Sequence, residues 1–354
     1  MRILQLNFER GWRGGERQTL LCAQQFRKAG HDVTLLVRKG EALARAAAAD
    51  GFAVHECRSL PGVCFFLLCR GRRFAILHAQ TPNTITWLAL LKWYLGRPIA
   101  FTRRTAFKVS GSAKKTLWKW RRVDLFAAIS EAAAAEPRRL GLRVIVIPSA
   151  VTAQPADAGH VEQLATQFNP DRKRVLATAA ALTREKDPDT LIRAIHRLKQ
   201  TRDDFVFLHL GAGGDAEQAA RQLVKQLGLE QHYIIAGFQA RMEDWYRLMN
   251  VFVSSSRHEA LGTSVLDAFL YRVPVVATNA GGVAESLAEG RGLLCEVGDD
   301  AAMADALARV LNDAALRESL VEKAHAYVLD RHDVTKMGTR YLSEYRRLID
   351  AARG

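Results

Sequence analysis

The sequence predicts an α/β protein built from two doubly wound, Rossmann-like parallel sheets. Short apolar runs alternate with amphipathic, helix-like stretches along the chain, which is typical of parallel sheets covered by helices. The chain has 354 residues, about twice the usual length of one domain. Residues 152–171 are polar, contain two prolines and show little periodicity. We therefore expect two sheets joined by a linker in this region.

The first half begins with an apolar run, residues 3–8, that predicts a buried strand. Residues 19–29 follow as a helix because apolar side chains recur there at helical spacing, and Gly30 stands where a helix-ending glycine belongs. Five further apolar runs predict strands at residues 33–37, 75–78, 99–102, 125–129 and 144–147. Together they indicate an N-terminal domain over residues 1–153.

The second half repeats the alternation after a linker at residues 154–171. The strands predicted there are residues 175–179, 205–210, 233–236, 251–254 and 273–277. Residues 333–352 read as one terminal helix. We therefore expect a C-terminal domain over residues 172–335 and a separate helical segment at 336–354.

The composition excludes several classes of protein. Apolar residues make up 49% of the chain and charged residues 25%, which excludes a disordered tail, a fibrous repeat and a disulfide-stapled miniprotein. Five cysteines with no C-x-x-C pair favour a reduced, cytoplasmic chain. The first residues lack the apolar core of a signal peptide, and no apolar run approaches about 18 residues. We expect no membrane-spanning segment.

The charge is distributed unevenly. Residues 1–150 hold 26 Lys and Arg against 9 Asp and Glu, whereas residues 151–354 hold 25 against 28. Between Lys92 and Arg122 there are ten basic residues and no acidic one, interleaved with Trp93, Tyr94, Trp118 and Trp120. Basic residues with Trp and Tyr favour an anionic membrane surface or a phosphorylated glycolipid. The alternatives are nucleic acid, on whose bases the rings would stack, and a solvated basic face whose aromatics lie in the core. Residues 61–69 are apolar; we favour a buried segment, and a second apolar contact with the membrane is the alternative.

Two glycine-rich segments each follow a predicted strand and precede a predicted helix. The first contains Gly14, Gly15 and Glu16 and lacks both the G-x-G-x-x-G spacing and the later acidic residue of a dinucleotide site. The second contains Gly211 and two further glycines. Glycines let backbone N–H groups approach a phosphate or sugar closely, but such turns also serve packing alone.

The segment from Ser254 to Asp267 carries the most specific pattern. A strand ends in a serine run, Glu259 lies in the loop, and Gly262 opens a helix. Free backbone N–H groups at a helix start suit a diphosphate, and two carboxylates flanking that site suit the hydroxyls of a sugar and a ribose. The alternative is an acidic helix start stabilised by its dipole. A second double glycine follows in the run P-V-V-A-T-N-A-G-G-V-A-E, residues 274–285.

These motifs resemble those of the retaining family 4 glycosyltransferases of the GT-B fold, including bacterial lipopolysaccharide-core enzymes. The pattern is E-x7-E with a glycine at its fourth position, followed by P-V-V-A-T-x-x-G-G-x-x-E; here Asp267 replaces the second glutamate. L-T-R-E-K at residues 182–186 matches the family's basic donor-phosphate motif. Gly14-Gly15 matches its N-terminal glycine loop, and His78 falls on the histidine that follows an early strand. The resemblance covers nearly the whole chain and implies that the terminal helix packs back on the N-terminal domain.

The resemblance implies roles for individual residues. Glu259 would hold the donor sugar and Asp267 the ribose, while Lys186 would neutralise the diphosphate. The implied catalytic residues are Glu259, Lys186 and Arg104. The implied donor-binding residues are Gly14, Gly15, Arg184, Lys186, Gly211, Glu259, Gly262, Thr263, Ser264 and Asp267. The implied acceptor-binding residues are Glu16, His78, Arg103 and Arg104.

There are three further departures from the family pattern, of which the first two concern the cationic and catalytic groups. Ala180-Ala181 stand where an arginine is frequent, so that Arg184 would supply the second cation. Arg103-Arg104 stand where a histidine is often found beside the reacting sugar. Ser149-Ala150 replace the usual Asn-Gly.

The function implied is a retaining hexosyl- or heptosyltransferase that uses a nucleotide diphosphate sugar, a UDP-sugar being slightly favoured. Its acceptor would be a membrane-associated glycolipid or oligosaccharide of the lipopolysaccharide core or another cell-envelope glycan. We expect a peripheral enzyme on the inner face of the cytoplasmic membrane, with no cofactor, no nucleic-acid partner and no metal. Asp187-Pro-Asp189 reads as a helix start and not as a metal-binding D-x-D. The alternatives are a nucleotide-sugar epimerase or phosphorylase of the same fold, and a non-catalytic basic nucleic-acid-binding protein.

Overall fold

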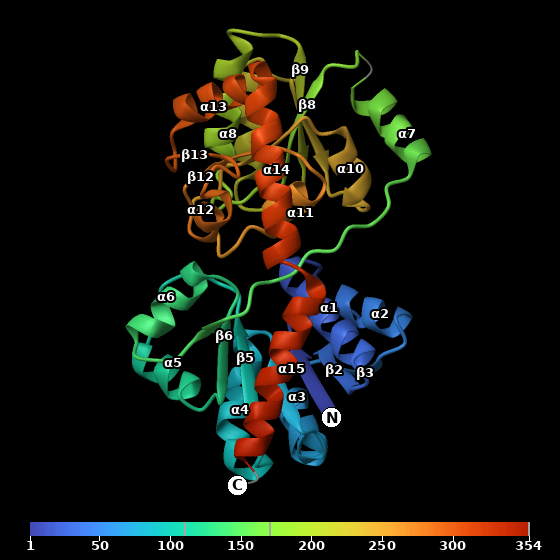
Figure 1. The fold of residues 1–354 in the computed structure, drawn as a ribbon, viewed down its shortest axis with the longest axis vertical. Coiled ribbons are helices and arrows are strands. Elements are labelled where there is room, and N and C mark those ends of the chain that lie inside the picture. The colour runs from blue at the N-terminus through green and yellow to red at the C-terminus, as the bar shows by residue number, and fades with distance from the viewer. Residues whose placement is uncertain (110, 170, 353–354) are drawn as a thin grey trace. The chain divides into compact units, whose positions relative to one another are not determined.

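The computed structural model describes residues 1–109, 111–169 and 171–352, which form two compact units (Figure 1). Unit 1 consists of Met1–Ala150 together with the chain from Arg331 onward, and unit 2 of Val151–Asp330. Each unit is built on one parallel sheet with helices on its faces. The predicted fold class, two doubly wound α/β units, is therefore confirmed.

The sheet of unit 1 has seven parallel strands in the order β3-β2-β1-β4-β5-β6-β7. The strands are β1 (Arg2–Asn7), β2 (Asp32–Arg38), β3 (Ala53–Cys57), β4 (Ile76–Ala79), β5 (Ile99–Arg103), β6 (Leu125–Ala128) and β7 (Ile145–Val146). Six of them fall on predicted strands. The seventh, β3, was not predicted because this edge strand buries only Cys57 and includes His55 and Glu56, so its apolar pattern is weak.

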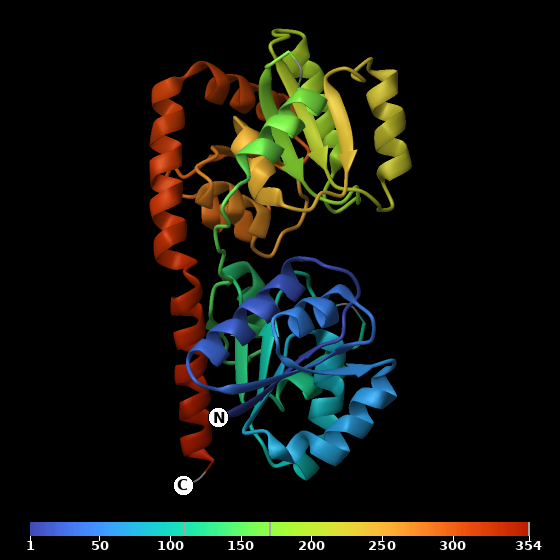
Figure 2. The ribbon, with the colours of Figure 1, turned by 90° about the vertical axis from the view of Figure 1, so that its right-hand side faces the viewer.

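Helices cover both faces of this sheet. They are α1 (Gly14–Lys28), α2 (Ala42–Ala49), α3 (Leu60–Arg70), the 3₁₀ turn η1 (Gly71–Arg73), α4 (Pro82–Leu95), α5 (Ala113–Trp120), α6 (Glu131–Arg139) and α15 (Val334–Ala351). α1, α2 and α15 share one apolar core with the sheet. The strand order reverses at β1, so right-handed crossovers carry α3, α4 and α5 to the opposite face (Figure 2).

Two predictions in unit 1 are corrected. The first helix begins at Gly14, five residues before the predicted start at residue 19, because the Glu16 carboxylate accepts the N–H of Arg13 (3.0 Å) and stabilises a first turn of poor helix formers. The apolar segment 61–69 forms most of α3, which buries Val63, Phe66 and Leu67 but leaves Phe65 70% exposed. It is a surface helix, and not a buried segment.

The sheet of unit 2 has six parallel strands in the order β10-β9-β8-β11-β12-β13. They are β8 (Arg174–Ala179), β9 (Phe205–Leu210), β10 (Tyr233–Gly237), β11 (Val251–Ser254), β12 (Val275–Thr278) and β13 (Leu293–Cys295). The helices are α7 (Ala158–Phe168), α8 (Pro188–Lys199), α9 (Glu217–Gln226), α10 (Met242–Leu248), α11 (Thr263–Leu270), α12 (Gly282–Leu287), α13 (Asp300–Asn312) and α14 (Ala314–Arg331). Only β13 was not predicted, because three residues carry too little periodicity.

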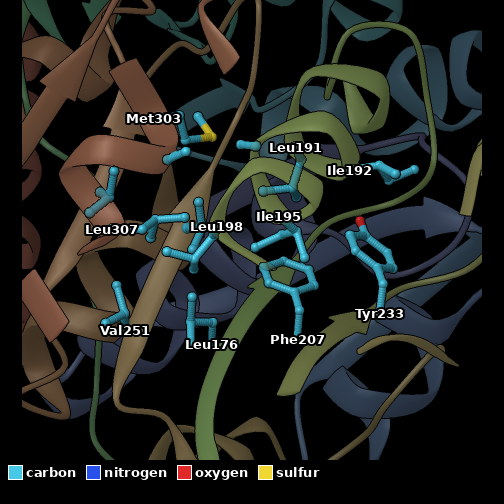
Figure 3. Close-up of a cluster of buried hydrophobic side chains, with 14 of the residues drawn as sticks. Leu176, Leu191, Ile192, Ile195, Leu198, Phe207, Tyr233, Val251, Met303 and Leu307 are labelled. Carbon is cyan, nitrogen blue, oxygen red and sulfur yellow. The ribbon is translucent and has the colours of Figure 1, made fainter. Parts of the chain in front are cut away.

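The core of unit 2 lies between its sheet and the helices α8 and α13. Leu191, Ile195 and Leu198 of α8 meet Met303 and Leu307 of α13 above the strands (Figure 3). All five side chains are at most 2% exposed. This packed layer fixes the position of α8 relative to the sheet. It thereby also fixes the end of the loop that connects β8 to α8.

The predicted linker at residues 154–171 contains a helix instead. α7 packs against α10, where Leu164 and Ala165 are buried and the ring centroids of Phe168 and Trp245 lie 5.2 Å apart. The Asp157 carboxylate caps α7 by accepting the N–H of Gly159 (3.0 Å). α7 thus belongs to unit 2. The predicted segment also includes residue 170, which lies outside the described residues.

α15 packs along α1 in unit 1, and buries Tyr341 and Tyr345 against Phe26. Across residues 1–109, 111–169 and 171–352, no helix combines the length and the apolar content needed to cross a membrane.

Candidate functional site

The loops that carry the predicted donor residues leave neighbouring strands of the unit 2 sheet. The strand order reverses at β8, which pairs with β9 on one side and with β11 on the other. Ligands of doubly wound sheets bind beyond the carboxyl ends of the strands at such a reversal. The two loops at this point are residues 180–187 after β8 and residues 255–262 after β11.

Lys186 and Glu259 form an ion pair between these two loops. The side chains are 28% and 19% exposed, so both charges are largely removed from water while remaining reachable. Two further hydrogen bonds join the loops: Ser255 Oγ donates to the carbonyl of Lys186, and the N–H of Arg257 donates to the carbonyl of Glu185, both at 2.8 Å. The structure thus brings together the two residues expected to act on the donor.

Asp187 and Arg257 support this pair and were not predicted as site residues. Asp187 is 3% exposed and adopts a left-handed backbone conformation. Its carboxylate forms an ion pair with the Arg257 guanidinium (Nε–Oδ2 3.0 Å) and accepts the hydroxyl of Thr190 (2.8 Å). Asp189 pairs instead with Arg193 on the next turn of α8. The sequence places Arg257 two residues before Glu259, but without the fold it does not show that Asp187 is the partner of Arg257.

The helix α11 begins at Thr263, next to Gly262, as predicted. Gly262 adopts φ +78°, and a side chain added there would lie 2.8 Å from Val283 and 3.5 Å from Glu259 Cγ. α11 begins at Thr263, so the N–H groups of Thr263 and Ser264 belong to the first turn and are not used by the helix's own hydrogen bonds. Asp267 lies on the second turn and is 8% exposed.

Loops from β9 and β12 close the other sides of this arrangement. The N–H of Gly282 donates to the carbonyl of Glu259 (2.9 Å). Gly211 follows β9, where a Cβ atom would lie 1.8 Å from the carbonyl oxygen of Ala180, so that only glycine fits. Arg184 is held by Asp215, which accepts its backbone N–H (3.0 Å) and pairs with its exposed guanidinium (3.6 Å).

His209 joins β9 to the loop after β8. Its Nε2–H donates to the carbonyl of Ala180 (3.0 Å), and the hydroxyl of Tyr233 donates to Nδ1 (2.7 Å). Burial lowers the pKa of His209 to about 4, so the ring is neutral at pH 7. The sequence places this histidine beside the glycine motif but does not reveal its structural role.

The predicted acceptor residues belong to unit 1, where the strand order reverses at β1. Arg104 follows β5 and is partly exposed; it donates from Nη2 to Gln80 Oε1 (2.6 Å) and from Nη1 to Ser149 Oγ (3.3 Å). Gln80 in turn donates to Gln5 Oε1 (2.6 Å). Arg104 is therefore a fixed cation in the loops at the carboxyl ends of β4 and β5.

His78 and Arg103 are interior residues of unit 1, contrary to their predicted contact with an acceptor. His78 is 0% exposed: Nε2–H donates to Thr102 (2.8 Å) and Nδ1 accepts the hydroxyl of Tyr345 (2.6 Å). Burial lowers its pKa to about 3. Arg103 is 5% exposed and donates to the carbonyls of Thr105 (2.8 Å) and Phe107. His78 has no exposed surface and supports its neighbours, and the Arg103 guanidinium is held by two backbone carbonyls.

Gly14, Gly15 and Glu16 form the first turn of α1. Glu16 is 4% exposed, and both its oxygens are occupied, one by the N–H of Arg13 (3.0 Å) and the other by the amide of Asn7 (3.3 Å). Its predicted contact with an acceptor is therefore replaced by helix capping. The backbone of the two glycines stays at the start of the helix, in a position suited to an anion.

Electrostatically, the loops of unit 2 suit a diphosphate. The loops bring one lysine into contact with one carboxylate that is within reach of solvent, and α11 begins with backbone amides that its own hydrogen bonds do not use. Cations and helix-start amides bind phosphate oxygens, whereas a carboxylate accepts hydroxyl protons. The arrangement fits a ligand that carries phosphates at one end and hydroxyl groups at the other.

Comparisons with known proteins agree with this chemistry. The family model described as Glycosyl transferases group 1 matches residues 162–327, and that described as Glycosyltransferase Family 4 matches residues 12–154. Two similar proteins are lipopolysaccharide core biosynthesis glycosyltransferases of Rhizobium meliloti (strain 1021). LpsE is 27% identical over 56% of this chain, which spans only 53% of LpsE; LpsD is 27% identical over 90% of this chain and 91% of LpsD. The solved structure of Anabaena Alr3699/HepE with UDP-glucose shares the fold, with a TM-score of 0.87 at 19% identity over 98% of this chain and 100% of that one.

Proposed function

The chain belongs to glycosyltransferase family 4 and has the GT-B fold, and on this premise we propose that it transfers a sugar from a nucleotide diphosphate sugar to a glycolipid or oligosaccharide acceptor. The observation that carries the proposal is the partly exposed pair of Lys186 and Glu259 next to the first turn of α11. A UDP-sugar is the first donor to test, because the Anabaena neighbour was solved with UDP-glucose.

In this proposal the Lys186–Glu259 ion pair forms when no donor is bound, and the donor separates the two side chains when it binds. A diphosphate takes Lys186 away from Glu259 and also accepts the N–H groups of Thr263 and Ser264. Glu259 then accepts hydroxyl protons of the sugar, and Asp267 those of the ribose. Cleavage of the glycosyl–phosphate bond builds negative charge on the diphosphate, and preorganised cations and amides stabilise such charge in the transition state.

The transfer is proposed to retain the anomeric configuration. The bond between the anomeric carbon and the phosphate oxygen breaks, a bond from that carbon to the acceptor oxygen forms on the same face, and the acceptor proton passes to the leaving phosphate. The sequence offers no second carboxylate at a position suited to act as a nucleophile. Binding both substrates in fixed geometry contributes much of the rate.

A metal is not required in this proposal. Asp187 and Asp189 form a D-x-D sequence, but their carboxylates contact Arg257 and Arg193 respectively. Lys186 and the α11 amides take the role that a cation has in metal-dependent transferases. Activity is therefore expected to persist in EDTA.

The acceptor is proposed to be a phosphorylated, membrane-associated glycolipid, such as a lipopolysaccharide core, to which a hexose or heptose is added. Unit 1 holds the excess positive charge, and Arg104 offers a fixed, partly exposed guanidinium there. The lipopolysaccharide names of LpsE and LpsD support this assignment. Loss of transfer to a dephosphorylated core supports it, and equal transfer to both forms contradicts it.

Thermal-shift titration with UDP-, GDP- and ADP-sugars tests the donor site. A donor at 100 times its Kd raises stability by about 2.7 kcal/mol. Lys186→Ala is expected to lose this shift, whereas Lys225→Ala, an exposed lysine on α9, retains it. Equal shifts in both variants contradict the assignment. Turnover of the donor without any acceptor, as an epimerase would show, contradicts the transferase proposal.

A further inference from the structure

Helix α4 leaves large apolar side chains in solvent. Leu90, Trp93 and Tyr94 are 55%, 99% and 46% exposed, and they follow Thr86 on the outer side of the helix. A tryptophan with 99% of its surface exposed contributes nothing to the packing of unit 1. Exposed apolar groups that gather on one face mark an interaction surface.

Helix α3 extends this apolar surface. Phe65 and Leu68 are 70% and 40% exposed, one helical turn apart. α3 packs beside α4, and the hydroxyl of Tyr94 donates to the carbonyl of Leu68 (2.7 Å), which fixes the two helices to each other. The exposed apolar side chains therefore form one rigid surface instead of scattered single positions.

The part of the sequence that forms this surface is rich in basic residues and contains no acidic residue. Residues 57–123 contain 14 Lys and Arg and no Asp or Glu. The nearest acidic residues along the chain are already engaged: Asp124 pairs with Lys92 (2.6 Å), and Glu56 accepts the N–H of Gly40 (2.6 Å). The guanidinium of Arg72 lies 5.6 Å from the ring centroid of Tyr94, at the edge of the apolar surface.

A groove of about 440 Å³ lies between α4 and α5 on the same side of the sheet. It is lined by Thr86, Lys114, Lys115, Trp118 and Lys119. The surface that lines the groove is mostly apolar, and the charged ends of the exposed lysines Lys114 and Lys115 suit phosphate groups beside it. The Arg122 guanidinium covers the ring of Trp118 at 3.9 Å and adds a further positive charge.

We infer that the surface formed by α3, α4 and α5, here the α3–α5 face, docks on a bilayer that contains anionic phospholipid. Trp93, Leu90 and Phe65 enter the interfacial region, and the exposed lysines of α5 bind lipid phosphates beside the α4–α5 groove. Aromatic and apolar side chains bordered by lysine and arginine are the features of interfacial membrane binding.

Charge complementarity selects a bilayer over the other possible partners. A second copy of the chain would bring two strongly basic faces together, which repel each other. Nucleic acid would stack its bases on the exposed rings but would leave the exposed leucines Leu68 and Leu90 without an apolar partner. An anionic bilayer satisfies the basic and the apolar side chains at once.

The α3–α5 face differs from the belt predicted between Lys92 and Arg122. Trp120 is 7% exposed and packs against Phe126, Lys92 pairs with Asp124, and Arg103 is buried. Trp120 and Arg103 face inward and Lys92 is held in an ion pair, which leaves the membrane surface to Trp93, Tyr94 and Trp118. The face gains α3, which lies outside the predicted belt.

This inference deepens the proposed function, since a lipid-linked acceptor requires the enzyme to approach a bilayer, but its test needs no turnover. The full chain is mixed with vesicles of phosphatidylcholine, with or without phosphatidylglycerol, and bound protein is measured by flotation. We expect binding only to the anionic vesicles, and binding that weakens as salt is added. Absence of binding to anionic vesicles at low salt overturns the inference.

Matched variants locate the surface. Lys114→Glu combined with Lys115→Glu is expected to weaken vesicle binding on the order of 30-fold. The control is Lys28→Glu with Lys39→Glu, which changes charge equally at exposed lysines of α1 and of the turn after β2. If both double variants lose the same amount of vesicle binding, the effect comes from net charge alone, and the assignment of the α3–α5 face is overturned.

The apolar contribution is tested at the most exposed side chains. Trp93→Ser with Phe65→Ser is expected to weaken binding at least about tenfold, because both side chains lose interfacial burial. Phe238→Ser, at a phenylalanine of unit 2 that is 71% exposed, is the control and should bind normally. Unchanged vesicle binding in the first variant, or a dimer of the wild type that Trp93→Ser dissociates, overturns the inference.

The two proposals fail separately. Vesicle binding with the expected variant pattern, but without transfer from any nucleotide sugar, contradicts the proposed function and leaves the docking surface in place. Transfer to a soluble oligosaccharide by a protein that does not bind anionic vesicles supports the transferase activity and contradicts the docking surface.

Discussion

Lys186 and Glu259 illustrate how one pair can serve both stability and ligand binding. Each side chain is less than a third exposed, so the charges interact more strongly than a surface pair but are still partly hydrated. In the absence of a donor, each neutralises the other. A diphosphate sugar offers a partner of opposite charge to Lys186 and hydroxyl donors to Glu259, so the site remains satisfied in both states.

A double-mutant cycle with Lys186→Met and Glu259→Gln measures this coupling. Each single variant leaves one partly buried charge unpaired and is expected to lower the free energy of unfolding by about 1 kcal/mol, whereas the double variant loses less than the sum. Transfer activity is expected to fall about 100-fold to 1000-fold in each single variant. Urea denaturation and initial rates provide the two measurements, and additive losses of stability contradict the pairing.

His209 predicts a pH dependence of the stability of unit 2. Its pKa is about 4 in the folded protein and about 6.5 when unfolded, so the unfolded chain binds the proton more tightly. The stability contributed by the neutral ring is therefore complete above pH 6.5 and is lost as the pH falls from 6.5 to 4, by about 3 kcal/mol in total.

Calorimetric unfolding of the wild type and of His209→Gln between pH 7 and pH 4 checks this prediction. The glutamine variant does not titrate, so the stability difference between the two proteins should shrink as the pH falls. A difference that stays constant across this range contradicts a neutral, buried His209.

At the scale of elements, the contact between α15 and α1 depends on one small residue. Gly338 faces Gln25, and a Cβ atom at Gly338 would lie 2.7 Å from the Cβ of Gln25. This close approach lets Tyr341 and Tyr345 reach Phe26 and the buried ring of His78. The helix therefore carries a glycine where its own propensity would favour alanine.

Gly338→Ala is expected to destabilise unit 1 by about 1 kcal/mol, because the steric cost of overpacking exceeds the gain in helix propensity. Thr339→Ala changes the next, exposed residue and should leave the stability unchanged or slightly higher. Thermal unfolding of both variants gives the comparison. A more stable Gly338→Ala protein would show that α15 does not approach α1 this closely.

At the scale of the whole molecule, unit 1 is completed by a segment distant in sequence. The chain leaves unit 1 after Ala150, forms unit 2, and returns at Arg331 to add α15. Tyr341 and Tyr345 are 1% and 0% exposed, and the loss of each buried aromatic side chain costs about 3 to 5 kcal/mol. Unit 2 is one continuous stretch with its own core.

Truncation after Asp330 is therefore expected to unfold unit 1 and to spare unit 2. Hydrogen exchange followed by mass spectrometry should show loss of protection in residues 1–150 and unchanged protection in β8, β9 and β11. A chain that ends at Ala351 retains α15 and serves as the control. Equal protection of unit 1 in both truncated chains contradicts the contribution of α15.

The predicted strands agree with the structure because a buried parallel strand is a continuous apolar run, which one sequence shows directly. β3 and β13 were missed because an edge position and a length of three residues dilute that run. α7 was read as a linker because its apolar residues Leu164 and Ala165 gain meaning only against α10. The donor motifs were found because each is local in the chain: Glu259, Gly262 and Asp267 keep a fixed spacing in one segment, and Lys186 ends a second short motif.

The sequence by itself determined the fold class, the two sheets and the family, since these depend on periodicity and on motifs local in the chain. Only the tertiary structure decided which motif residues reach solvent. Lys186 and Glu259 meet at the reversal of strand order, whereas His78 and Arg103 lie inside unit 1. The structure also showed that Phe65 and Trp93 point outward while Trp120 points inward. The physical reason is that burial depends on the elements packed around a side chain, and these come from distant parts of the chain.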